Sequence, residues 1–130
     1  MSRPLVRVSC GGRRWLVRVE DLREVVPMMA LAAAEGLGGE CRGLLNLRGE
    51  LVPVFDKTGG PASPARLILV LREPAGPVGL LVDEVHEVVF LTDAQLTPRP
   101  VGGGRTRSMA LLNGELFSVL EPAEVAAHVG

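Results

Sequence analysis

The chain has 130 residues, with 14 Lys and Arg against 15 Asp and Glu, and a formal charge of −1 at pH 7. This length suits one compact domain, or two very small lobes that share a core. The balanced charge and an aromatic content of 3% argue against nucleic acid as the main partner, because nucleic-acid-binding proteins usually combine a basic excess with stacking aromatic rings.

The sequence also argues against export and membrane insertion. The N-terminal residues lack the apolar stretch and small-residue cleavage site of a signal peptide. No apolar run approaches the roughly 20 residues of a membrane-spanning helix. The spacing of Cys10 and Cys41 fits neither a metal site nor a redox motif. We therefore expect a cytoplasmic protein with two buried or half-buried free thiols.

The first third of the chain predicts a β-hairpin followed by less regular segments. Two short apolar runs on either side of a glycine pair predict strands over 5–10 and 14–19. Residues 20–26 are expected to form a short helical or irregular turn. The Ala-rich stretch that follows predicts a short helix over 29–35.

The rest of the chain predicts short strands separated by turns. Asn113-Gly114 is the strongest hairpin signal, residues 92–96 resemble a capped helical turn, and 122–129 predict a short C-terminal helix. Segments 57–65 and 98–107 are expected to be loops. The strands expected are two runs within 43–55, then 66–71, 78–82, 85–91, 109–112 and 115–120.

One apolar run and an internal repeat predict how these strands assemble. Residues 67–71 do not alternate in polarity, so this strand should be buried on both faces, as at a junction between two lobes. Residues 19–26 match 82–89 at a shift of 63, and 49–56 match 114–121 at a shift of 65. Chance would account for either match alone, but two in the same order favour a duplication. We expect two small antiparallel barrels side by side.

The sequence assembles no active site. His86-Glu87 begins like a zinc-protease motif, but Phe90 stands where the second His ligand would be needed. We expect no catalytic residue, no metal site and no cofactor. An enzyme that uses Asp56 or Asp83 in a groove between the lobes remains a rival.

A second rival is a small-barrel protein that binds nucleic acid. It would need a basic stripe on one side of the molecule. The arginines available for such a stripe are Arg3, Arg7, Arg13, Arg14 and Arg18.

Residues 43–56 carry Asn46-Leu47-Arg48-Gly49 followed by Pro53 and Asp56. This segment resembles the signature of the bacterial chemotaxis coupling proteins of the CheW-like family. Residues 22–25 and 79–88 resemble two further family motifs in the same order. The resemblance covers roughly 5–129, whereas segments 28–42 and 57–65 depart from the family pattern.

The resemblance implies an all-β fold of two intertwined five-stranded SH3-like barrels with short helices, in a single domain over 1–130. It implies a non-enzymatic adaptor that couples chemoreceptors to a CheA-type histidine kinase. The helical hairpin at the cytoplasmic tip of the receptor would lie in the groove between the lobes, and the regulatory domain of the kinase would pack on the barrels.

The resemblance also implies site residues. The residues expected to bind the receptor are Arg48, Asn46, Leu22 and Glu24. Those expected to border the partner interfaces are Gly43, Leu47, Gly49 and Val25. From residue type alone, Arg48 would equally suit a structural arginine that pairs with Glu50 or with a backbone carbonyl.

Overall fold

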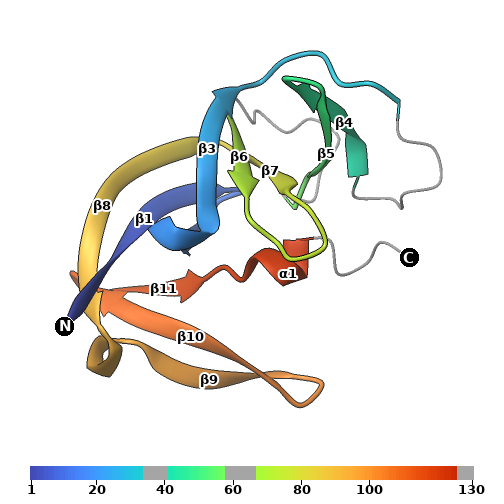
Figure 1. Ribbon diagram of the computed structural model, residues 1–130. Helices are drawn as coiled ribbons and strands as arrows, with labels where there is room; N and C mark the ends of the chain where they lie inside the picture. Colours follow the sequence, from blue (N-terminus) through green and yellow to red (C-terminus); the bar gives the residue numbers. More distant parts are fainter. Residues whose placement is uncertain (34–40, 58–66, 126–130) are drawn as a thin grey trace.

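The computed structural model describes residues 1–33, 41–57 and 67–125, and these residues are mostly strands (Figure 1). The strands are β1 (Ser2–Cys10), β2 (Arg13–Arg18), β3 (Leu22–Pro27), β4 (Cys41–Leu47), β5 (Glu50–Phe55), β6 (Leu67–Leu71), β7 (Val78–Val82), β8 (Glu84–Thr92), β9 (Thr97–Gly102), β10 (Arg105–Leu112) and β11 (Glu115–Val119). The helical turns are η1 (Val19–Asp21), η2 (Asp93–Gln95) and α1 (Pro122–Val125). No helix in the described part is long and apolar enough to cross a membrane.

The strands form two sheets, each of which builds one lobe. Lobe A has the order β8-β1-β2-β11-β10-β9, and lobe B has the order β3-β6-β7-β5-β4. The pairs β11–β2 and β5–β7 are parallel, so the expectation of purely antiparallel barrels was wrong in this detail. The all-β class with two lobes is confirmed. Lobe A carries a sixth strand, β9, in addition to the five expected.

The register of strand pairing shows that the two halves of the chain repeat one another. Val6 lies opposite Val17 in the β1–β2 pair, and Leu69 lies opposite Leu80 in the β6–β7 pair. Both partners are therefore shifted by 63 residues, as the sequence match predicted.

The hairpins that end the two halves correspond in the same way. Leu45 pairs with Val52 in β4–β5, and Ala110 pairs with Phe117 in β10–β11, a shift of 65 residues. The duplication inferred from the sequence is therefore confirmed at both shifts.

The two halves exchange strands between the lobes. The third strand of the first half, β3, pairs with β6 of the second half, and β8 of the second half pairs with β1 of the first. The parallel pairs β5–β7 and β11–β2 also join strands of different halves. Each lobe therefore contains strands from both halves, which makes the lobes intertwined.

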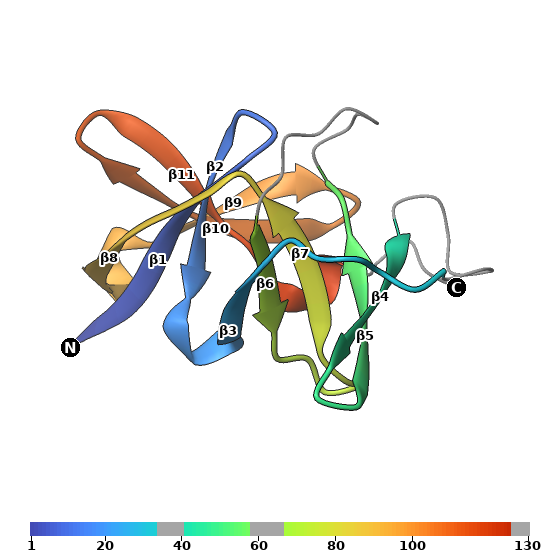
Figure 2. The ribbon, with the colours of Figure 1, turned by 90° about the horizontal axis from the view of Figure 1, so that it is seen from above.

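The core consists of three apolar clusters. One fills lobe A and one fills lobe B. The largest forms a seam between the lobes, to which β1 and β2 of lobe A and β6 and β7 of lobe B contribute side chains. Figure 2 shows these four strands in the middle of the molecule. In β6, Leu69 and Leu71 face the seam, while Ile68 and Val70 face lobe B. The prediction that this run is buried on both faces is confirmed. Its burial contributes about 1.5–3 kcal/mol per side chain.

Three predicted segments differ from the structure. Residues 20–26 form η1 and then strand β3, because pairing with β6 overrides the helix-like spacing of the apolar residues. The predicted loop 98–107 is largely β9 and the start of β10. The helix expected over 29–35 is absent from residues 29–33, and its last two residues lie outside the described part.

A close approach of two backbone segments closes lobe B. Ala32 and Leu44 exchange two backbone hydrogen bonds of 2.8 Å. A Cβ atom on Gly43 would lie 2.6 Å from the Ala32 carbonyl oxygen and 2.8 Å from the Leu31 Cβ atom. Gly43 also has a φ of 146°, which disfavours other residues. Glycine is therefore required here by both space and backbone conformation.

We predict that Gly43→Ala destabilises the protein by about 3 kcal/mol, since it combines backbone strain with a clash. Gly114→Ala is the matched control, because Gly114 has a φ of 81° but open space around it. The control should cost only about 1 kcal/mol. Urea denaturation of both variants checks this. Equal costs would show that the close approach to Ala32 is unimportant.

The burial of Cys10 generates a second prediction. Desolvation raises the pKa of its thiol to about 11, with Asp83 and Asp56 adding to the effect. Because the thiolate is the reactive form, Cys10 should resist iodoacetamide at pH 8 in the native protein and react after denaturation. Peptide mass spectrometry measures this. Alkylation of native Cys10 as fast as half-buried Cys41 would contradict it.

Candidate functional site

The turn between β4 and β5 presents Arg48 at one end of lobe B. Arg48 and Gly49 have φ angles of 52° and 89°, the left-handed values of a tight hairpin turn. The Asn46 side chain supports the turn, because its Oδ1 accepts a 2.9 Å hydrogen bond from the Gly49 N–H. Arginine is an unusual residue at positive φ, where Asn or Gly is favoured.

Arg48 holds Glu24 of β3 with two hydrogen bonds. Its Nη2 donates to Glu24 Oε2 at 2.6 Å, and its Nη1 donates to Glu24 Oε1 at 3.3 Å. These bonds lower the pKa of the Glu24 carboxyl. Arg23 donates to Glu50 at 2.6 Å, so the alternative in which Arg48 pairs with Glu50 was wrong. The four residues form a charged network, which we call the charged quartet.

The second half of the chain offers an internal comparison for this turn. At the position equivalent to Arg48, 65 residues on, stands Asn113, with a φ of 51°. The equivalent of Glu24 is Glu87, which pairs with Arg7 instead. The fold therefore builds the same turn with the residue that local sterics favour. Arg48 therefore has a strained backbone conformation that the fold does not require, which indicates that its side chain has a role of its own.

The structure brings together some of the predicted site residues and not others. Arg48, with 67% of its side chain exposed, lies with Glu24, Asn46 and Gly49 at the β4–β5 turn. Val25 is 38% exposed on β3.

The other predicted residues are less accessible. Leu22 packs partly against the seam, while Gly43 and Leu47 are buried. Sequence reasoning missed Leu51, which is 58% exposed and lies opposite Asn46. Its signal was an apolar residue at a position that faces outward in the alternation of β5.

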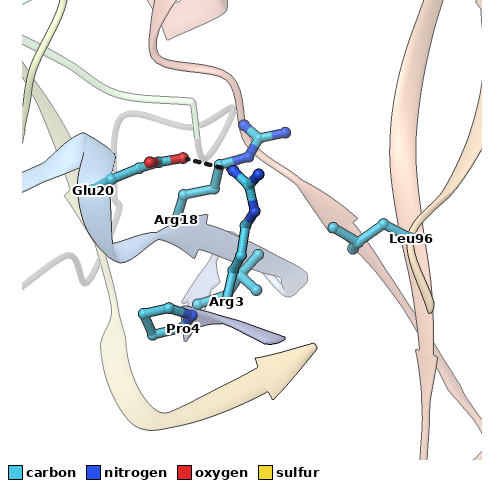
Figure 3. A pocket seen from close by; sticks show the side chains of 6 residues that line it. Arg3, Pro4, Arg18, Glu20 and Leu96 are labelled. Carbon is cyan, nitrogen blue, oxygen red and sulfur yellow. Dashed lines mark ion pairs between the residues drawn. The ribbon is translucent and has the colours of Figure 1, made fainter. Parts of the chain in front are cut away.

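A cavity of about 250 Å³ lies in lobe A beside the start of β1 (Figure 3). Arg3 and Arg18 line it together with Glu20, over apolar side chains that include Leu96. At the position equivalent to Arg18 in lobe B stands Leu81, which is buried. The two lobes therefore differ in the residue at this position.

Carboxylates already pair with the arginines of this cavity. Arg18 donates to Glu121 at 2.7 Å. Arg3 lies 3.9 Å from Glu20 and 3.7 Å from Asp93. The positive charge of the cavity is thus neutralised within the chain, which disfavours an anionic ligand.

Within residues 1–33, 41–57 and 67–125, the chemically reactive side chains do not form a catalytic arrangement. His86 Nε2 lies 2.9 Å from Ser9 Oγ, and the same nitrogen lies 3.6 Å from Glu84. In a catalytic triad, the carboxylate would instead accept a hydrogen bond from the opposite ring nitrogen and so orient the imidazole. Asp56 is paired with Arg42 at 2.8 Å, and Asp83 accepts a hydrogen bond from the Gly11 N–H at 3.0 Å.

The basic stripe considered from the sequence is not continuous. Arg7 pairs with Glu87 and lies over the Phe117 ring, and Arg14 pairs with Glu115. Arg13 and Arg14 line the same shallow hollow, and of the two only Arg13 lacks a carboxylate partner among the described residues.

Comparison with known proteins identifies the family. A family model described as a CheW-like domain matches residues 4–130. The chain belongs to the CheW-like family. It is 29% identical over 105 residues to the probable chemotaxis protein CheW of Rhizobium etli, and 26% identical over 105 residues to the chemotaxis protein CheW of Rhizobium meliloti. Each alignment covers 76% of this chain and 68% of the relative.

A solved structure supports the CheW-like fold. The scaffolding protein TtCheW from Thermoanaerobacter tengcongensis superimposes with a TM-score of 0.78 at 21% identity, and the match covers 93% of this chain and 90% of that one. The family and fold expected from residues 43–56 are therefore confirmed, and the chain is a chemotaxis adaptor of the CheW-like family.

We predict that Arg48→Asn leaves the fold intact and changes the titration of Glu24. Asparagine relieves the strain at positive φ, and the lost ion pair is exposed, so the melting temperature should change by only a few degrees. Without Arg48, the pKa of Glu24 should rise toward its ordinary value.

Carbon-13 NMR of the Glu24 carboxyl measures this effect. In the wild type, the ion pair should persist until the pH falls through the lowered pKa of Glu24. An unchanged pKa, or loss of folding, would contradict the prediction.

Proposed function

We propose that this CheW-like protein couples the cytoplasmic tips of chemoreceptors to a CheA-type histidine kinase, without catalysing a reaction. The observation that carries this proposal is the family match over residues 4–130, combined with Arg48, an exposed residue of the signature-like segment 43–56 that pairs with Glu24 of β3. We place the protein in the cytoplasm, where both partners present the relevant surfaces, and we propose that 1–130 acts as one domain with two lobes.

The surface around the charged quartet has the properties of a protein contact. Arg48 offers donors in a fixed plane that suit carboxylates and backbone carbonyls. Val25 and Leu51 are exposed apolar side chains on β3 and β5, the strands that also carry Glu24 and Glu50 of the charged quartet. A cluster that combines an exposed arginine with apolar side chains is typical of the energetic centre of an interface.

The receptor in this proposal is a helical hairpin that lies between the lobes. Leu22, at the start of β3, packs partly against the seam, so it lies where the two lobes meet. Gly43, Leu47 and Gly49 contribute by shaping the β4–β5 hairpin rather than through large exposed side chains. The adaptor would change kinase activity by binding one receptor state more tightly than another.

No specific observation favours the nucleic-acid alternative. Four of the five arginines considered for a basic stripe pair with a carboxylate, which leaves only Arg13 without such a partner among the described residues. The formal charge of −1 also disfavours phosphate binding.

The proposal predicts that Arg48→Asn weakens binding of a receptor tip at least tenfold, a loss of the size usual for a central interface arginine. Arg72→Asn is the matched control, because Arg72 is exposed outside the charged quartet. Isothermal titration of the purified protein with a receptor tip and, separately, with a kinase regulatory domain checks this.

Two outcomes would contradict the proposal. Binding of neither partner at concentrations well above the micromolar range would overturn the coupling function. Equal binding by Arg48→Asn and the wild type would remove Arg48 from the receptor site.

A further inference from the structure

A second concave site lies on lobe A at the start of β2. Its volume is about 280 Å³. Arg13, Arg14 and Trp15 line it from β2, Arg107 from β10 and Leu116 from β11. We call it the arginine pocket. It lies on the other lobe from the charged quartet, so the receptor contact proposed at the quartet does not account for it.

The arginine pocket carries an excess of positive charge. Arg14 Nε lies 3.2 Å from a Glu115 carboxylate oxygen, and Arg107 pairs with Glu124. Within the described residues, the side chain of Arg13 makes no hydrogen bond or ion pair, and Arg13 is exposed. Three guanidinium groups therefore face two carboxylates, which leaves one positive charge available to a ligand.

Apolar side chains border these charges. Leu116 is 51% exposed, and its cross-strand partner Leu111 is 69% exposed. The Arg107 guanidinium lies 5.0 Å from the centre of the Trp15 ring and covers one of its faces. The site thus places donors for an anion beside an apolar surface.

The duplicated architecture shows that the fold does not require these arginines. The β6–β7 hairpin of lobe B repeats the β1–β2 hairpin, since Leu71 pairs with Val78 as Val8 pairs with Trp15. At the positions equivalent to residues 13, 14 and 15, lobe B has Gly76, Pro77 and Val78. The strand pairing of lobe B ends at Leu71 and Val78, so the part of the hairpin that the two lobes share forms without arginine or tryptophan.

We infer that the arginine pocket binds an acidic segment of a partner protein, in which a Glu or Asp carboxylate lies next to an apolar side chain. The carboxylate would pair with Arg13 and Arg14, since guanidinium and carboxylate groups match in geometry. The neighbouring apolar side chain would cover Leu111 and Leu116, which removes exposed apolar surface from water.

A protein segment fits this site better than a nucleic acid does. Arg107 already covers one face of Trp15, which limits stacking by a base. The exposed leucine pair offers nothing to a phosphate backbone.

The single tryptophan of the chain lies in the site, so its fluorescence reports binding directly. The probe is a capped hexapeptide of alternating glutamate and leucine, titrated into the full chain. Its control replaces each glutamate with glutamine. We expect the acidic peptide to change Trp15 emission, and the double variant Arg13→Ser, Arg14→Ser to bind it at least tenfold more weakly.

Arg72→Ser, an exposed arginine outside the pocket, is the matched control and should bind the peptide like the wild type. If the double variant loses its native circular dichroism, Arg13→Ser alone supplies the comparison, with a weakening of at least threefold. These experiments contain neither receptor nor kinase, so their outcome is independent of the coupling function.

Three results would overturn the inference. One is no change in Trp15 emission with about 5 mM acidic peptide, the weak end of useful affinity. Another is equal binding of the glutamine peptide, which would leave only apolar contact. The third is salt-sensitive binding of oligouridylate without binding of the acidic peptide, which would assign the pocket to nucleic acid.

Discussion

The seam between the lobes is the contact on which the rest of the structure depends. Strands β1 and β2 from the first half of the chain, and β6 and β7 from the second, each send alternate side chains into it. Their other side chains fill the two lobe cores. Because β3 and β8 also cross between the halves, neither half can complete a barrel alone. The relative position of the lobes is fixed by the same apolar burial that folds them.

This duplicated frame separates what the fold needs from what the surface adds. Lobe A makes its last turn with Asn113, as local sterics favour, whereas lobe B uses Arg48 at the same left-handed conformation. Conversely, lobe A carries an arginine and tryptophan cluster where lobe B has Gly76, Pro77 and Val78. A residue that differs between equivalent positions of the two lobes is therefore not required by the fold. The arginines at these differences, Arg48 in lobe B and Arg13 and Arg14 in lobe A, are exposed, as the binding surfaces proposed for them require.

Features encoded by neighbouring residues were predictable from the sequence, and features created by distant contacts were not. The doubly buried run 67–71 and the duplication followed from local pattern. Segment 20–26 was misassigned because the spacing of its apolar residues also fits a helix. Segment 98–107 was predicted to be a loop from its prolines and glycines, but these residues are tolerated on the edge strand β9. The pair of Arg48 and Glu24 joins residues 24 positions apart, so the sequence suggested Glu50 instead.

Native-state hydrogen exchange in increasing denaturant tests the central claim, that one shared seam holds both lobes together. The account predicts that amides of β1 and β2 open with the same free energy as those of β6 and β7, equal to that of global unfolding. It also predicts that this equality holds at every denaturant concentration below the transition. Opening of β6 and β7 at a clearly lower free energy than β1 and β2 would show two independently stable lobes and would contradict the account.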